Sequence, residues 1–172
     1  METKVTTPAI KGIIISLILI VFSLVTIYTG QMENQALGFI PIVIFIAGII
    51  WGCINYAKQM EGNVTFGNAF GHGFKITATV VVLMTIYTLL LFLVIRPELQ
   101  EYSLEKAREA MEKQNNNMSE SDIDNAVAMT KKLMMPIMIG SIILMYGIGG
   151  CIASLIGAAV AKKNPNQTPF NQ

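Results

Sequence analysis

The side chain with the most obvious chemistry is His72, the only histidine in the 172 residues, which stands between Gly71 and Gly73. Imidazole can act as a general base or bind a metal, but one chain with one histidine cannot build a metal site of several histidine ligands. No serine, cysteine or pair of acids stands beside it at catalytic spacing. We therefore expect an interfacial side chain or a contact with a lipid headgroup.

Sulfur atoms and carboxylates offer three further chemistries. Cys53 and Cys151 form no C-x-x-C pair and lie in apolar stretches, so we expect buried, unreactive thiols. Pliable packing explains a group of methionines better than Cu(I) binding does: Met129, Met134, Met135, Met138 and Met145. A series of glutamates is either a metal or partner surface or a solvated helical face: Glu98, Glu101, Glu105, Glu109 and Glu112. The sequence thus predicts no enzyme, with no catalytic, cofactor or metal site.

A segment rich in glycine and phenylalanine, residues 65–75, is the most distinctive motif. Thr65 can cap a helix in which phenylalanines recur every four residues and share one face. The interpretation is a short amphipathic helix lying in the membrane interface before the third span. Contact with a ligand is the alternative to packing. The residues of this interfacial segment are Thr65, Phe66, Phe70, His72, Phe74 and Lys75.

Four long stretches without a charged residue must position these side chains. The chain is 53% hydrophobic and 13% charged, whereas soluble domains are about 25% charged. A helix of about 20 apolar residues crosses a bilayer, and lipid excludes irregular backbone. The sequence predicts an all-α polytopic membrane protein, one domain over residues 1–172. Its four transmembrane helices are expected at about residues 13–29, 37–56, 76–95 and 134–161.

Residues 96–132 form the only sizeable polar segment, between the third and fourth spans. Pro97 is suited to start a helix with acidic residues in its first turn. Three asparagines at 115–117 interrupt that helix, and Ser119 with Asp122 resembles the capping box of a second one. The pattern predicts a charged excursion of two helices, the second of which runs into the fourth span.

Small residues recur in the second and fourth spans at a spacing that lets membrane helices touch closely. Such ridges either close the bundle internally or bind another membrane protein or a second copy, and the spacing alone does not choose. The residues are Gly48, Gly52, Gly149, Gly150, Ala153, Ser154, Gly157 and Ala158.

None of the four windows contains an ionisable side chain, which ion-coupled transporters usually need inside the membrane. This argues against ion-coupled transport and leaves a carrier of neutral or lipid-linked solutes open. The net charge of +1 gives no reason to expect nucleic acid as a partner. Because Lys4 and Lys11 precede the first span and only Glu33 follows it, we expect both termini in the cytoplasm.

Several short motifs are similar to those of a known family: Thr65–Phe70 followed by Gly73–Lys75, then Met118–Glu120, Met129–Lys132 and Lys162–Pro165. They resemble the domain-of-unknown-function 4199 family, small four-span membrane proteins of Bacteroidota. The resemblance implies a protein of the bacterial inner membrane with no catalytic residues to carry over. It also suggests a polyprenol-phosphate glycosyltransferase or other envelope machinery as a partner.

Two functions fit these patterns. The first is an accessory or scaffold subunit of a larger membrane complex, binding through the small-residue ridges and the charged excursion. The second is a small carrier or flippase for lipid-linked sugars or another neutral amphiphile, favoured by the four-span size and the uncharged third helix with its hydroxyl groups. Membrane lipids and a further membrane protein, or a second copy, are the expected partners.

Overall fold

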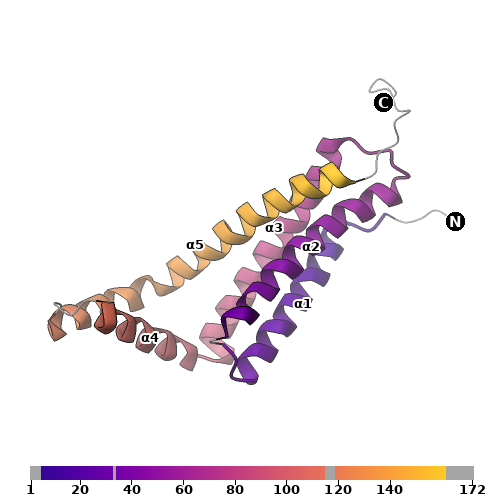
Figure 1. Cartoon of the computed structure of the whole chain (residues 1–172). Helices are drawn as coiled ribbons and strands as arrows, with labels where there is room; N and C mark the ends of the chain where they lie inside the picture. The colour runs from indigo at the N-terminus through magenta and orange to yellow at the C-terminus, as the bar shows by residue number, and fades with distance from the viewer. Residues whose placement is uncertain (1–4, 33, 115–118, 162–172) are drawn as a thin grey trace. The chain divides into compact units, whose positions relative to one another are not determined.

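The computed structural model describes residues 5–32, 34–114 and 119–161 (Figure 1). The elements in chain order are α1 (Pro8–Tyr28), α2 (Gln35–Gln59), α3 (Phe66–Leu90), the π-helical turn η1 (Leu91–Ile95), α4 (Glu98–Gln114) and α5 (Glu120–Val160). These ranges contain no strand, so the all-α prediction is confirmed.

Four helices are long and apolar enough to cross a membrane: α1, α2, α3 with η1, and α5. Each is longer than the apolar window that predicted it, because backbone hydrogen bonding continues through polar residues that favour helix. The difference is largest in α5, whose 41 residues start at Glu120 and take Pro136 into the helix. At a rise of 1.5 Å per residue, α5 is roughly twice as long as the hydrocarbon core is thick.

The interfacial segment is not a separate helix, so that prediction is wrong. Phe66 to Leu90 form one continuous helix, because no residue between Phe74 and the apolar part of α3 breaks it. The cap is real, since the Thr65 hydroxyl accepts a hydrogen bond from the Asn68 amide at 3.1 Å. The predicted aromatic face is real as well, with Phe66–Phe70 and Phe70–Phe74 ring centroids 6.5 and 6.1 Å apart.

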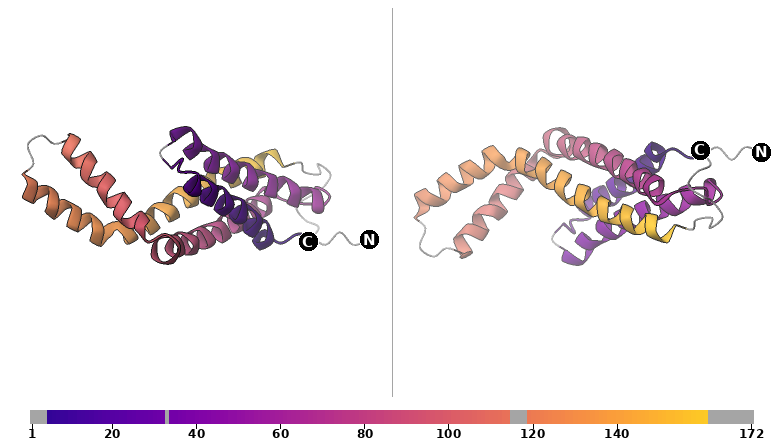
Figure 2. Two further views of the ribbon diagram at one scale, coloured as in Figure 1. Left: turned by 90° about the horizontal axis from the view of Figure 1, so that it is seen from below. Right: turned by 90° about the horizontal axis from the view of Figure 1, so that it is seen from above.

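The described residues divide into two compact units. The first unit, which we call the bundle, holds α1, α2, α3 as far as Met84, and α5 from Leu144 onward. Its helices lie side by side and run in alternating directions (Figures 1 and 2). The ring of Phe45 on α2 meets Tyr146 on α5 edge-on, with centroids 4.8 Å apart.

Glycines bring the backbones of the bundle together. A Cβ on Gly12 of α1 would lie 2.6 Å from Cβ of Thr79 on α3. A Cβ on Gly48 of α2 would lie 2.9 Å from Ile15 on α1. Real Cβ atoms do not approach neighbours so closely, so these crossings require glycine. In lipid, where hydrophobicity does not drive helices together, such close van der Waals contact is a main source of stability.

The second unit comprises Thr85–Ile143 and contains a helical hairpin made of α4 and the first half of α5 (Figure 2). The Ser119 hydroxyl accepts from the Asp122 amide, and the Asp122 carboxylate accepts from the Ser119 amide, each at 3.2 Å. This is the predicted capping box. Leu99 and Ile123 are buried, and Arg108 Nη2 on α4 lies 3.0 Å from the Asp124 carboxylate on α5. We call this element the α4–α5 hairpin.

Arg108→Gln is expected to loosen the α4–α5 hairpin without unfolding it. The substitution removes the Asp124 pair between helices and the 3.1 Å pair with Glu112 within α4, both at the surface. Exposed pairs contribute little individually, so the effect should be a few-fold faster amide exchange in α4. Hydrogen exchange measured by mass spectrometry checks this. Lys131→Gln, an equal loss of charge at an exposed site on α5, should leave the exchange of α4 unchanged.

The first turn of α4 is expected to fray in acid. The backbone amide of Glu98 and then the Arg96 guanidinium, both of which bond the Glu98 carboxylate, lower its pKa. A carboxylate with a lowered folded pKa stabilises the fold above its ordinary pKa, and this contribution is lost as pH falls through the lowered value. Amide exchange at residues 98–102 should therefore accelerate, relative to intrinsic rates, only at the acidic end. Glu98→Gln should abolish that pH dependence, and a dependence that persists in this variant would contradict the assignment.

Candidate functional site

A buried lysine is the most unusual feature of the bundle. Lys11 lies in the first turn of α1, and its side chain enters the bundle with no exposed surface. Its Nζ donates a hydrogen bond to the carbonyl oxygen of Gly52 on α2 at 3.2 Å. The same nitrogen lies 3.3 Å from Nε2 of His72 on α3. One side chain thus joins three helices.

His72 is held by this contact on one side and by an aromatic ring on the other. Only 7% of the residue is exposed, and its imidazole stacks on Tyr56 of α2 with centroids 4.2 Å apart and planes inclined by 11°. An ammonium at Lys11 donates to Nε2 only if Nε2 is unprotonated, which assigns the imidazole proton to Nδ1. In this state Lys11 is charged and His72 is neutral. We call these residues, with Tyr56 and the Gly52 carbonyl, the Lys11–His72 cluster.

The surroundings of the cluster explain how a lysine fits there. Gly52 has no Cβ, which leaves room for the side chain of Ile76 and for the Lys11 stem, whose Cδ would lie 3.8 Å from such an atom. Next to them the thiol of Cys53 donates to the Ala69 carbonyl at 3.5 Å. No carboxylate pairs with Lys11 in the described part of the chain. With Lys11 protonated, the cluster therefore holds a buried positive charge that has no ionic partner among the described residues.

These positions add to the sequence predictions. Lys11 and His72 lie outside the four predicted windows, yet both side chains are buried among the helices of the bundle. The four spans were predicted from stretches that contain no charged residue, so Lys11 was assigned to the region before the first span. The missed signal is helical spacing, since Lys11 shares a face with Ile15 and Leu19, both buried. Ionisable groups in membrane-spanning helices are costly to bury and are commonly functional.

The hydroxyl groups in the bundle bond within their own helices. Ser16 donates to the carbonyl of Gly12 at 2.8 Å, and Thr77 donates to that of Gly73 at 3.1 Å. Ser154 donates to the carbonyl of Gly150 at 2.6 Å. These three groups are satisfied without a ligand. They do not mark a polar path through the bundle.

The small-residue ridges are used inside the bundle. Gly150 packs against Thr77, a Cβ on Gly157 would lie 2.9 Å from Cys53 Sγ, and Ala153, Ser154 and Ala158 have no exposed surface. Gly149, which is half-buried, faces Phe45 at 3.7 Å. Most of these residues therefore pack inside the bundle, while Gly48 and Gly149 are partly exposed.

The interfacial segment contributes one residue to the cluster, His72. Phe66, Phe74 and Lys75 are exposed and Phe70 is half-buried. No side chain approaches the position that a Cβ on Gly71 would take, whereas one on Gly73 would lie 2.6 Å from Cys53 Sγ. The close crossing is therefore made by Gly73, which the sequence did not single out.

The two cysteines differ. Cys53 is fully buried, as predicted, while Cys151 is only half-buried. Among the described residues, no three His, Cys, Asp or Glu side chains lie close enough together to hold a metal ion. Chemically, the Lys11–His72 cluster can exchange protons, because it pairs an amine with an imidazole.

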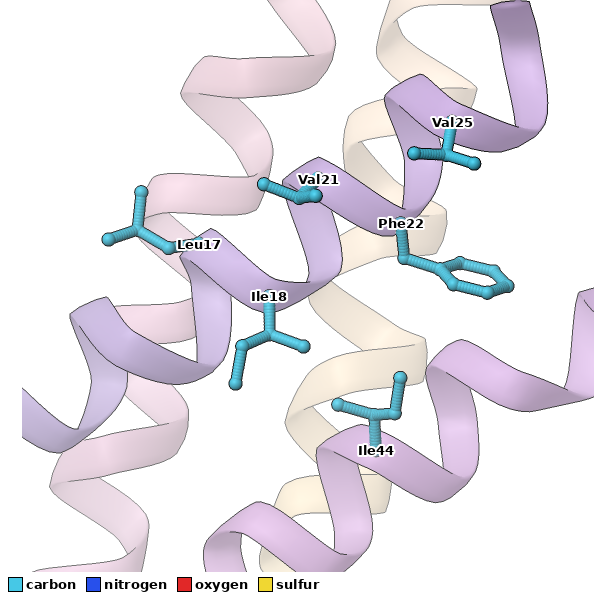
Figure 3. Close-up of a pocket in the computed structure, with 6 residues that line it drawn as sticks. All are labelled: Leu17, Ile18, Val21, Phe22, Val25 and Ile44. Carbon is cyan, nitrogen blue, oxygen red and sulfur yellow. The ribbon is translucent and has the colours of Figure 1, made fainter. Parts of the chain in front are cut away.

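A second candidate site is an apolar groove of about 450 Å³ between α1 and α2. Figure 3 shows its lining, Leu17, Ile18, Val21, Phe22 and Val25 from α1 and Ile44 from α2. A smaller hollow of about 270 Å³ shares Phe22 with it and reaches the polar side chains of Gln31 and Asn34. None of the described lining residues is charged. We call the two hollows together the α1–α2 groove.

Comparison with known proteins gives one match. No curated protein and no solved structure matches the chain. The family described as "Protein of unknown function (DUF4199)" matches residues 11–163, which is most of the sequence and includes both Lys11 and His72. The family resemblance is therefore confirmed, and this helical membrane protein belongs to the domain-of-unknown-function 4199 family.

Proposed function

We propose that this protein is a non-enzymatic accessory subunit of a larger complex in the bacterial inner membrane. Both termini would lie in the cytoplasm. The α4–α5 hairpin, which follows the third span, would contact the partner outside the cytoplasm. The observation that carries the proposal is the hairpin itself, which has buried apolar side chains, a capping box and an ion pair between its helices. Because these contacts stabilise the α4–α5 hairpin, it can present one defined surface to a partner protein.

The chemistry of that surface indicates the kind of partner. The hairpin buries Leu99, Ile123 and Met134, whereas Met129 on α5 is exposed. Glu101 and Glu105 stand one helical turn apart on α4, and both are exposed. A polar rim of this kind favours a partner with complementary basic residues, bound through charge pairs and water rather than a large apolar patch. An envelope enzyme such as a polyprenol-phosphate glycosyltransferase fits the family resemblance.

The experiment is purification from native membranes in a mild detergent, followed by intact-complex mass spectrometry. We expect the wild-type chain in stoichiometric complex with a second membrane protein. Glu101→Lys with Glu105→Lys should release that protein, whereas Glu101→Asp with Glu105→Asp, which keeps both charges, should retain it. A wild-type chain that runs as a single species would refute the accessory function.

A carrier or flippase for a lipid-linked or neutral amphiphile is the second candidate, and the α1–α2 groove favours it. The larger hollow of the groove is apolar, and the smaller one reaches the amide side chains of Gln31 and Asn34. The first could hold the acyl chain of an amphiphile and the second its uncharged polar part. The reconstituted protein should then move a fluorescent polyprenyl-phosphate sugar across vesicles. Val21→Trp, which fills the groove, should stop movement, while Val82→Trp, at an equally exposed site on α3, should not. No movement by the wild type would exclude this activity.

A further inference from the structure

The Lys11–His72 cluster has a property that neither an accessory subunit nor a carrier requires. Its two nitrogens lie 3.3 Å apart inside the bundle, close enough for a hydrogen bond that contains one proton. The ammonium of Lys11 supplies that proton, and the lone pair on Nε2 of His72 receives it. A second proton on Nε2 would remove the acceptor and place two cations at hydrogen-bonding distance.

Among the described residues, no printed contact places a carboxylate beside the pair to balance the second charge. The groups around it are the carbonyl of Gly52, the thiol of Cys53 and the ring of Tyr56 from α2, Lys75 from α3, and Ser154 and Gly157 from α5. None of these is a carboxylate, Lys75 is itself a cation, and a thiol is neutral in acid. The repulsion between the two charges would therefore act in a poorly hydrated site where it is weakly screened.

We propose that the Lys11–His72 pair is a proton-operated latch: with one shared proton it ties the first turn of α1 to α2 and α3, and uptake of a second proton by His72 releases that turn. Imidazole carries one or two ring protons depending on pH, which suits it to this role. The latch does not depend on the proposed function, because it concerns the bundle alone.

The structure indicates which part would move. The chain before α1 has one other described polar tie to α2, in which the Thr6 amide donates to Gln59 Oε1 at 3.0 Å and Gln59 Nε2 donates to the Thr6 hydroxyl at 2.9 Å. Farther along, Gly12 and Ile15 hold α1 against α3 and α2 by packing. Release would therefore be local to the first turn. It would uncover Cys53, which lies beside the Lys11 site and has no exposed surface in the closed state.

The first arm of the test observes the proton directly. Because the sequence has one histidine, the full chain labelled with ¹⁵N-histidine gives the signals of His72 alone, provided that the affinity tag contains no histidine. In lipid nanodiscs we expect the Nδ1-protonated neutral ring at about pH 8 and the doubly protonated ring at the acidic end of the titration. Lys11→Met, which removes the neighbouring charge, should move this titration upward by at least about one pH unit, or tenfold in proton affinity. A ring that stays neutral throughout, or a titration that Lys11→Met leaves in place, would overturn the proposal.

The second arm observes the opening. The measurement is the rate at which maleimide labels Cys53 in a Cys151→Ser background. This rate is divided by the rate in the matched His72→Gln variant. Glutamine keeps an acceptor for Lys11 but cannot gain a proton. The ratio cancels the ordinary pH dependence of the thiol. We expect a ratio near one at about pH 8 and a rise of about tenfold at the pH at which the first arm finds His72 doubly protonated. A ratio that stays near one while His72 becomes protonated would show that the proton opens nothing. Lys11→Met provides a second check, because protonation of His72 without a neighbouring charge should leave Cys53 protected.

Discussion

Gly73→Ala is expected to destabilise the bundle by about 1–3 kcal/mol, the range measured when atoms are added to a packed core. The new Cβ would lie 2.6 Å from Cys53 Sγ, 2.8 Å from Ser154 Oγ and 3.0 Å from Ser154 Cβ. Neither neighbour can move away easily, since both have short side chains without exposed surface. Three helices meet at this point, so a shift of any of them disturbs the others.

The matched control lies two residues earlier in the same helix. No side chain stands within 4 Å of a Cβ built on Gly71, so Gly71→Ala adds a methyl group in open space. Alanine is preferred over glycine in helices by about 0.5–1 kcal/mol, so this variant should be neutral or slightly more stable. The free energy of unfolding, obtained by titrating mixed micelles with sodium dodecyl sulfate, compares the two. Equal stability for Gly73→Ala and Gly71→Ala would contradict the packing described for α3.

His72→Phe is expected to lower the free energy of unfolding by about 2 kcal/mol, as when a buried charged group loses a hydrogen-bond partner. Phenylalanine can keep the stack on Tyr56 but has no acceptor, so the buried ammonium of Lys11 would retain only the Gly52 carbonyl. His72→Gln, which can still accept from Lys11, should cost less. The order of the two variants therefore separates the role of the ring from that of its nitrogen.

Removal of the Lys11 charge should restore part of the stability that His72→Phe loses. In the double variant Lys11→Met with His72→Phe, neither an ammonium nor an unpaired imidazole is left in the bundle, and replacement of buried polar pairs by apolar residues of similar volume is often neutral. The double variant should thus be less damaged than the sum of the single variants, with a coupling of at least about 1 kcal/mol in a double-mutant cycle. The same micelle titration measures all four proteins. Additive effects would mean that Lys11 and His72 do not interact as described.

The spans and the α4–α5 hairpin could be predicted because each depends on local properties of the sequence. Long stretches without charge leave helix as the only backbone that satisfies itself in lipid. Ser119 and Asp122 mark a helix start by chemistry that acts within one turn. Such features need no knowledge of which helices are neighbours, and the structure reproduces them.

The Lys11–His72 cluster could not be predicted in that way, since it joins residues 61 positions apart through a third helix. The motif around His72 was interpreted as a short separate helix, whereas it forms the first part of the continuous helix α3. The use of the small-residue ridges was equally hidden. Gly150 has a role because Thr77 faces it, and the pairing of α3 with α5 is a property of the fold rather than of either segment.

The burial of Lys11 also bears on how the chain is made. Membrane helices emerge from the ribosome in order, and α1 leaves before α3 exists. Until then the ammonium has no imidazole to bind, and it can stay hydrated only at the membrane surface. Under the proposed orientation, with both termini in the cytoplasm, Lys11 would act twice during synthesis, first as an orientation signal in water and later as a bond between helices. The second role begins when α3 delivers His72, so assembly of the bundle cannot be complete after the first helical pair.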